Sequence, residues 1–519
     1  MFSSLYYKAQ VVLGLILLGS VGLPAQKTTT KNATTTPAKP AAKPGGGGIA
    51  RTSNQGGPTK NSTASRPGPT ANGGPNRGPS ANRPMANGGT TATRPTANGG
   101  TTATRPAANR GAPPPKSGTT GITGRPLAKG SQQVQLKGGN ALQRRSNGQI
   151  SDVHVAGRGM DIHHSLGGGR QVVVERADHS RIFAERGRPG FIQRPYSFHG
   201  HEFAARSYSY HGQVYQQFYR GYAYRGAAIQ VYAPAHYYSV GFYGWAYNPW
   251  AAPVTFSWGF GAAPWYGYYG GYFAPSPVYP NASLWLTDYM ISNDLADDYA
   301  AGQETGTLAQ AQPRDNAPPE VTPEVKQMIS NEVQNQINLE NAEAQTSPNA
   351  DVDPASSGIA RMLGDGHRHV FVVSSSLDVI DDSGSECALS GGDALGLSSQ
   401  PSPDATAVSL VVLSSKGSRE CAKSVKVTVA LNDLQEMQNH MRATIDRGLG
   451  ELQAKQGKGG LPTAPPSAQA APTKAAFADL APPPAPNDAN DINQQLIAAD
   501  QAEKDVTSQA PASGNSNNP

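Results

Sequence analysis

Short apolar runs alternate with turn residues over residues 143–231, and this alternation predicts antiparallel β-hairpins. Gln171–Glu175 and Gln213–Phe218 are the clearest strands, because apolar and aromatic residues recur there between glycine-containing turns. An aromatic–any–aromatic–basic–glycine motif occurs three times, beginning at Tyr196, Tyr208 and Tyr222. Each copy runs a strand directly into a turn, so the region is predicted to be a β-meander.

Residues 322–345 carry apolar side chains at helical spacing. Thr322 suits the N-cap of a helix and Pro323 suits its first turn. The apolar stripe consists of Val325, Met328, Ile329, Val333 and Ile337. Such a stripe needs a partner, which is either the C-terminal domain or another copy of the chain.

Two further segments are predicted to be helical. Residues 283–299 begin at Ser283, a candidate N-cap, and residues 432–456 begin at Asn432 with Gln435 at the third helical position. The second helix has one apolar stripe, formed by Leu434, Met437, Met441, Ile445, Leu449 and Leu452. This amphipathic helix, like residues 322–345, is a candidate surface for a protein partner or for self-association.

Five short apolar runs precede the helix at 432–456, and together they predict a small β-barrel or sandwich, SH3-like in size. They are His369–Val373, Leu377–Ile380, Ala394–Leu397, Ala407–Leu413 and Cys421–Ala430. Cys387 and Cys421 are the only two cysteines. In an exported chain such a pair predicts a disulfide, and two buried thiols are the alternative.

The predicted fold class is mainly β with a few helices: a β-hairpin domain, a small SH3-like barrel followed by an amphipathic helix, and large disordered segments. Tracts rich in Gly, Pro, Thr and Ala cannot bury enough apolar surface to offset the entropy of ordering. The predicted segments are a signal peptide (1–25), a disordered basic tail (26–140), an aromatic- and His-rich hairpin domain (141–300), a linker (301–321), an amphipathic helix (322–345), a second linker (346–366), the barrel with its helix (367–456) and a disordered tail (457–519) with one short helix near residues 491–505.

The first 25 residues have the pattern of an export signal. Lys8 precedes the apolar run Val11–Leu18, and small residues up to Ala25 follow it. The run is too short to span a bilayer, and an uncleaved anchor is the alternative. We therefore expect the periplasm, the cell envelope or the extracellular space.

The stretch of residues 27–151 is strongly basic. It contains 18 Lys or Arg and no Asp or Glu. Such a stretch attracts anionic polymers and membrane surfaces, and outside the cytoplasm these are envelope polymers rather than nucleic acid. A charged spacer without a partner is the alternative.

Residues 226–287 contain no Asp, Glu, Lys or Arg, and all five tryptophans lie within or near this range. The segment is too interrupted by Pro and Gly to be a membrane helix. Its rings either form an exposed stacking surface or wrap over the hairpins as their core. The candidates for an exposed surface are Trp245, Trp250, Trp258, Trp265 and Tyr266.

Histidines are concentrated in the hairpin region. His199 and His201 are two residues apart, so in a strand they would share a face and could chelate Zn²⁺ or Cu²⁺. The candidate ligands are His163, His164, His199, His201 and His211. The alternative is that these histidines are polar aromatic residues preceding turn glycines, with no cofactor.

The sequence contains no G-x-S-x-G, H-E-x-x-H, Walker or G-x-G-x-x-G motif in a suitable context. We therefore expect a protein that is not an enzyme.

Several aromatic motifs support a resemblance. The segments ERADHSRIF, YSFHGHEF, FYGWAYNPW and WYGYYGGYFAPSPVYP resemble a group of uncharacterised exported bacterial proteins, whose C-terminal part is similar to HVFVVSSSLDV and VALNDLQEM. The resemblance implies an exported protein with a Tyr/Trp/Gly-rich centre and a small C-terminal β domain, and it implies no activity.

These observations predict an exported, non-enzymatic binding or structural protein, either secreted or associated with the envelope. Its basic tail would contact anionic cell-surface polymers. The alternative is an exported transition-metal-binding protein that uses the histidine-rich hairpins. A hydrolase with an unrecognised site is the third hypothesis.

Overall fold

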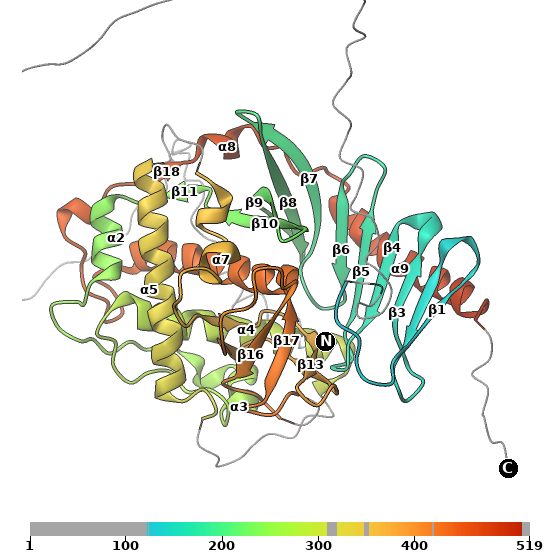
Figure 1. Cartoon of the computed structure of the whole chain (residues 1–519). Coiled ribbons are helices and arrows are strands. Elements are labelled where there is room, and N and C mark those ends of the chain that lie inside the picture. The colour runs from blue at the N-terminus through green and yellow to red at the C-terminus, as the bar shows by residue number, and fades with distance from the viewer. Residues whose placement is uncertain (1–121, 123, 309–318, 347–351, 418–419, 511–519) are drawn as a thin grey trace, which may run out of the picture. The chain divides into compact units, whose positions relative to one another are not determined.

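The computed structural model describes residues 122, 124–308, 319–346, 352–417 and 420–510 (Figure 1). All of them belong to one compact unit. The predicted signal peptide and residues 26–121 of the predicted basic tail lie outside the described residues. The described part contains three β-sheets and several helices, so a β-rich chain with helices is confirmed.

The first sheet is an antiparallel meander of ten strands that follow one another in chain order, which confirms the predicted hairpins. Strand β1 lies within residues predicted to be disordered, so that prediction is wrong there; β1 is polar, and pairing with β2 places it in the sheet. The strands are β1 (Gln132–Gln135), β2 (Ala141–Arg144), β3 (Ile150–Val155), β4 (Met160–His164), β5 (Arg170–Glu175), β6 (Arg181–Glu185), β7 (Gly190–Phe198), β8 (His201–Tyr210), β9 (Gln213–Tyr224) and β10 (Ala227–Ala233).

The three aromatic motifs each end in a two-residue hairpin turn. Phe198 pairs with His201, so His199 and Gly200 alone connect β7 to β8. Both turn residues have positive φ, 50° for His199 and 84° for Gly200. The turns at His211-Gly212 and Arg225-Gly226 repeat this pattern. Positive φ at both central positions is the requirement of a type I′ turn, which explains the recurring glycine.

One face of strands β2 to β6 is apolar and is covered by helix α9 (Asp488–Thr507) (Figure 1). On α9, Ile492, Ala499, Ala502 and Val506 are buried against this face. The prediction of a disordered tail is therefore wrong for residues 457–510, whereas the predicted short helix near residues 491–505 is confirmed. A Pro/Ala-rich segment cannot form a core alone, but here it docks on an apolar face that already exists.

Residues before α9 also dock on the rest of the chain. Strand β18 (Thr473–Lys474) pairs with β11 (His236–Tyr237), and the short helix α8 (Ala476–Asp479) follows it. Phe477 of α8 is buried against Phe203 and Phe218 of the meander.

A helical core lies beside the meander. It is built from α2 (Val240–Tyr247), α3 (Pro264–Tyr269), α4 (Ala282–Thr305), α5 (Pro323–Thr346) and α7 (Leu431–Lys455). The predicted helix at 322–345 is confirmed as α5, and the Thr322 hydroxyl accepts a hydrogen bond from Val325 N at 3.3 Å. Val325, Ile329, Val333 and Ile337 are buried, whereas Met328 is 38% exposed, so its place in the stripe is wrong.

Two helix starts differ from the prediction. Helix α4 is capped by Asn281, which accepts from Leu284 N, rather than by Ser283, and it extends to Thr305 into the predicted linker 301–321. Helix α7 begins directly after β17 at Leu431, without a side-chain cap at Asn432. Its predicted apolar stripe is buried, so burial of Leu431 and the stripe determines where this helix begins.

The aromatic segment is interior rather than an exposed surface. Trp250 and Trp265 are each 7% exposed, and Trp245, Trp258 and Tyr266 are half-buried against the same core. This core includes residues of α4, α5 and α7, so the rings pack on helices instead of wrapping over the hairpins. A segment without charged side chains can be enclosed in this way at little desolvation cost.

The C-terminal sheet has six strands in the order β12-β15-β16-β17-β13-β14, all antiparallel. Strand β14 was not predicted, and the predicted strand at 421–430 begins only at Lys426. The SH3-like barrel stays a prediction. The strands are β12 (Val370–Val372), β13 (Leu377–Asp381), β14 (Glu386–Leu389), β15 (Ala394–Leu397), β16 (Ala407–Val412) and β17 (Lys426–Ala430).

The predicted disulfide between Cys387 and Cys421 is present and joins β14 to the segment that precedes β17. A short helix, α6 (Ile359–Met362), interrupts the predicted linker 346–366 and is buried against this sheet.

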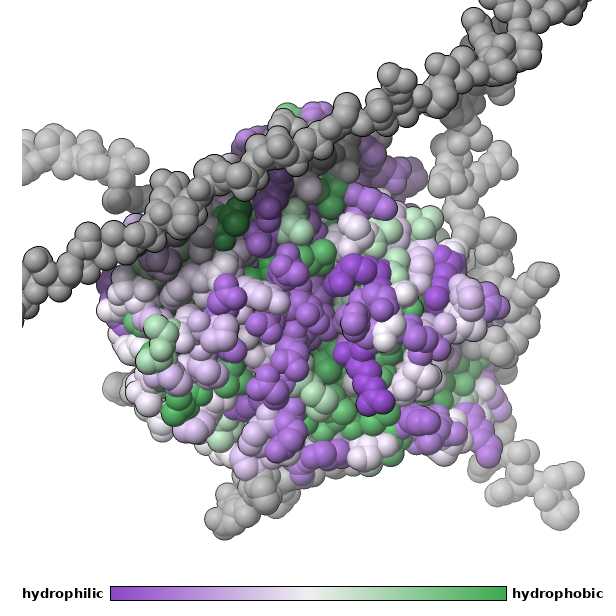
Figure 2. Space-filling view, turned by 60° about the vertical axis from the view of Figure 1, so that its left-hand side comes forward, coloured by the Kyte–Doolittle hydropathy of each residue, from purple (hydrophilic) through white to green (hydrophobic). Residues whose placement is uncertain are grey.

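The apolar stripes of α5 and α7 are both used inside the chain. On the face shown in Figure 2, hydrophilic residues are interspersed with smaller apolar areas. Among the described helices, none is long and apolar enough to cross a membrane.

Candidate functional site

The second face of the meander carries a row of polar residues, one from each of five neighbouring strands. In the strand register Gln143 lies opposite Asp152, Asp152 opposite His163, His163 opposite Gln171, and Gln171 opposite Glu185. All five side chains are buried. Because side chains alternate along a strand, this row faces away from α9. On this side the row contacts residues in and just before β13 of the C-terminal sheet.

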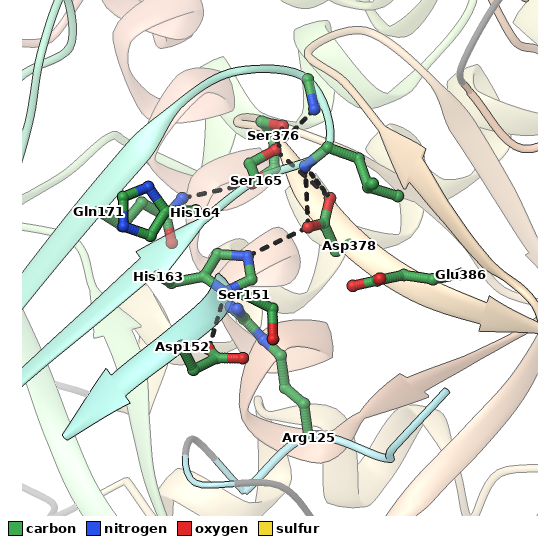
Figure 3. A network of polar contacts seen from close by, with 12 residues as sticks. Arg125, Ser151, Asp152, His163, His164, Ser165, Gln171, Ser376, Asp378 and Glu386 are labelled. Carbon is green, nitrogen blue, oxygen red and sulfur yellow. Dashed lines mark hydrogen bonds and ion pairs between the residues drawn. The ribbon is translucent and has the colours of Figure 1, made fainter. Parts of the chain in front are cut away.

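His163 lies at the centre of this row, between two carboxylates (Figure 3). Its Nδ1 lies 2.8 Å from Asp152 Oδ1, and its Nε2 lies 3.3 Å from Asp378 Oδ2 on β13. Burial lowers the pKa of His163, but the hydrogen bonds to Asp152 and Asp378 outweigh it and raise the pKa to about 9. The imidazole is therefore a cation at neutral pH and joins the meander to the C-terminal sheet.

Two arginines complete this polar network. Arg145 donates to Asp378 and to Glu386, each at 2.7 Å, and Arg125 pairs with Asp433 of α7 at 3.1 Å. Both arginines fall within residues 27–151, which were predicted to contact anionic polymers. These two cations form internal ion pairs instead. Arg145 supplies the counter-charge of the buried Asp378, whereas Arg125 and Asp433 form a half-buried pair.

Asp378 also holds the turn between β4 and β5. It accepts hydrogen bonds from Leu166 N at 3.0 Å and from the Ser165 hydroxyl at 3.3 Å (Figure 3). The Ser165 hydroxyl lies 2.6 Å from that of Ser376. The same carboxylate thus neutralises buried cations and positions a turn, and this turn forms one wall of a cleft.

The cleft has a volume of about 390 Å³ and lies where the meander meets the helical core and the C-terminal sheet. Its walls come from the β4–β5 turn, the end of β6, helices α3 and α4, and the loops around β14 and β16. The lining includes Leu166, Gly167, Gly169, Glu185, Arg186, Arg188, Tyr268, Tyr269, Tyr272, Asp298, Thr305, Thr307, Ser376, Ser390, Lys416 and Glu420.

Two of the cations in this lining, Arg188 and Lys416, are paired with groups of the protein itself. Arg188 donates to Asp298 at 2.7 Å and to the carbonyl of Ser374 at 3.2 Å. Lys416 Nζ contacts the Ser390 hydroxyl and Gly391 O at 2.7 Å, and Asp393 at 3.2 Å. These three contacts use all the donors of an ammonium group.

The carboxylates of the lining also have hydrogen-bond or ion-pair partners within the protein. Asp298 accepts from Tyr269 as well as from Arg188, and Glu420 accepts from the Ser390 hydroxyl at 2.5 Å. Burial raises the pKa of Glu185, against the opposing effect of Arg188. These acids therefore serve to hold the walls of the cleft together.

Arg186 differs from the other charged groups in the lining. It lies directly after β6 and is exposed, and it has no hydrogen bond or ion pair with any other described residue. Next to it, Gly187 has a φ of 79°, and a Cβ there would lie 2.8 Å from Ala301 Cα. The turn that carries Arg186 is thus fixed against α4 by a glycine.

The histidines predicted as metal ligands are distributed over different environments. His163 and His164 are adjacent and point to opposite faces, and His164 lies 2.8 Å from Glu503 of α9. His199 occupies a turn rather than a strand, so it does not share a strand face with His201. His211 lies in the next turn, 3.7 Å from Glu304. Within the described residues, no group of three His, Cys, Asp or Glu could hold a metal ion.

The polar row was not recognised in the sequence because its members are unevenly spaced along the chain. Each of these strands alternates apolar and polar residues, which is the pattern of a strand with one face in solvent, so the sequence contained no sign that the polar face is also covered. Only the hairpin register shows that these five residues align.

No family model, curated protein or solved structure matches the chain in three comparisons with known proteins. The resemblance to uncharacterised exported proteins stays a prediction.

Proposed function

We propose that this chain is an exported, non-enzymatic binding protein that holds a small polar ligand in the cleft. The observation that carries the proposal is the cleft itself. Its volume of about 390 Å³ lies within the range of small-molecule sites. Its walls come from separate parts of the chain and are fixed by buried ion pairs, as a preorganised binding site requires.

A non-catalytic role is supported by the chemistry of the lining. A hydrolytic site pairs a nucleophile with a general base within hydrogen-bond reach. No histidine or cysteine occurs among the described residues that line the cleft. Ser390 is a lining hydroxyl beside both Glu420 and Lys416, and it donates its proton to Glu420 at 2.5 Å. Burial lowers the pKa of Lys416, but Asp393 and Glu420 outweigh it and raise the pKa, so Lys416 is held as a cation rather than as a free base.

Export is supported by the sequence pattern of residues 1–25 and by the disulfide, which is typical of oxidising compartments. We further propose that the basic stretch before Arg125 contacts anionic envelope polymers. It would keep the ordered part near the cell surface, while the cleft binds its ligand. The SH3-like barrel remains a proposal for the C-terminal sheet.

The proposal is tested by ligand-dependent thermal stability of the full chain. Glucose, N-acetylglucosamine, sodium glucuronate and sodium glutamate are each added at about 10 mM, because a ligand that binds the folded state raises its stability. Thr307→Trp adds an indole to the lining, and Thr346→Trp makes the same change at an exposed position on α5.

We expect at least one compound to raise the melting temperature of the wild type and of Thr346→Trp but not of Thr307→Trp. If no compound raises the melting temperature, or if Thr307→Trp responds as the wild type does, the cleft is not the binding site.

A further inference from the structure

The cleft holds one cation that the fold does not use. Arg188 and Lys416 are both paired with carboxylates of the protein, whereas Arg186 has no partner among the described residues. A guanidinium presents a planar fork of N–H donors that matches a carboxylate or a phosphate. Arg186 is therefore available to bind an anionic group of a ligand.

The charge balance of the lining favours a singly charged anion. Arg186, Arg188 and Lys416 are opposed by Glu185, Asp298 and Glu420, so the formal charges cancel. A phosphate monoester carries nearly two negative charges at neutral pH and would meet three carboxylates with only one free cation. A carboxylate carries one charge and needs only Arg186.

Hydroxyl groups supply the rest of the recognition surface. Thr305 donates to Ala301 O at 2.9 Å and Ser390 donates to Glu420 at 2.5 Å, while Ser376 shares a hydrogen bond with Ser165. A hydroxyl that has donated its single proton still accepts hydrogen bonds. The lining thus offers acceptors to a ligand that is rich in hydroxyl donors.

Tyr268 adds a partly exposed aromatic ring to the lining. Its centroid lies 4.8 Å from that of Tyr269 and 5.5 Å from that of Tyr299, so two neighbouring rings hold it in place. A tyrosine ring offers an apolar face beside a polar tip. The C–H face of a pyranose ring fits against such a surface.

We infer that the cleft binds a carboxylated sugar of the uronic acid class. Arg186 pairs with its carboxylate, Tyr268 packs against its ring, and the lining hydroxyls accept from its hydroxyl groups. This inference rests on the proposed function and assigns the ligand class of the same cleft. Envelope and extracellular glycans contain such acidic sugars, which agrees with export.

The test is calorimetric titration of the full chain with sodium glucuronate, glucose and sodium glucose 6-phosphate. Arg186→Gln removes the free cation. Arg181→Gln is the matched control, because Arg181 is an exposed arginine at the start of β6, the strand that Arg186 follows, and it does not line the cleft. We expect glucuronate to bind about tenfold or more tightly than glucose, since a hydrogen bond to a charged group is the larger contribution. Arg186→Gln should abolish this preference, and Arg181→Gln should preserve it.

Three outcomes would overturn the inference, and they separate it from the proposed function. If glucose binds as tightly as glucuronate and Thr307→Trp blocks both, the cleft binds sugars but the anionic class is wrong. If glucose 6-phosphate binds more tightly than glucuronate, the ligand class is a sugar phosphate and not a uronic acid. If none of the three binds, and none of the compounds in the thermal test does, the proposed function fails too.

Discussion

The buried imidazolium of His163 predicts a stability that depends on pH. In the folded chain the pKa of His163 is raised to about 9, against about 6.5 in an unfolded chain. A raised pKa means that the folded state binds the proton more tightly. The resulting stability is therefore fully present below pH 6.5 and is lost as the pH rises through 9. At about 1.4 kcal/mol per pH unit, the difference corresponds to an upper limit of about 3 kcal/mol.

The perturbation that isolates this effect is His163→Asn, measured by urea unfolding at pH 6, 7, 8 and 9 at constant ionic strength. His179→Asn is the control, because His179 is exposed and its positive φ of 64° is one that asparagine tolerates. The loss of the His163 ring leaves a constant packing cost at every pH. We expect the stability difference between wild type and His163→Asn to shrink by about 2–3 kcal/mol from pH 6 to pH 9. A difference that stays constant over this range would show that folding does not raise the pKa of His163, and the proposed imidazolium would be wrong.

Replacing both Cys387 and Cys421 by serine removes a cross-link between positions 34 residues apart. The free energy of unfolding should fall by about 4 kcal/mol in denaturant titrations, and an unchanged midpoint would show that the disulfide adds no stability. Ala499→Asp places a charge in the buried contact between α9 and the meander, so α9 should detach. We expect faster amide hydrogen exchange in α9 and stronger binding of a hydrophobic dye to the meander. Ile497→Asp is the control, because Ile497 is 71% exposed, and it should have neither effect. Gly187→Ala should weaken glucuronate binding by displacing the Arg186 turn from α4, and Gly212→Ala, which has the same φ requirement but open space around it, should not. Equal effects of the two glycine variants would mean that φ alone is responsible.

Features that depend on neighbouring residues in the chain could be predicted from the sequence. The hairpin turns at His199-Gly200 and Arg225-Gly226 follow from local backbone requirements, and helix α5 follows from the spacing of Val325, Ile329 and Val333. The disulfide followed from the presence of only two cysteines in a chain with an export pattern.

Features that depend on distant docking could not be predicted. Helix α9 is ordered because it covers an apolar face contributed by residues more than 300 positions earlier in the chain, such as Ile162 and Val172. Asp378 and Glu386 reach the meander only because the C-terminal sheet lies beside it. The aromatic segment lacks charge, which is compatible with both exposure and burial, and only the surrounding helices determine that it is interior.

The histidines show the same limit. Their concentration in the hairpin region indicated a metal site, but their separation into turns, opposite faces and ion pairs depends on the strand register. Among them, His163 joins the meander to the C-terminal sheet through its contacts with Asp152 and Asp378. Since one of these, Asp378, also holds the β4–β5 turn, the network supports the wall of the cleft.

The binding site is tested by a crystal structure of the full chain soaked with sodium glucuronate. We expect density for the sugar in the cleft, with its carboxylate against Arg186 and its ring against Tyr268. Density at another place on the molecule, or an empty cleft in crystals where calorimetry shows binding, would contradict the assignment of this cleft as the functional site.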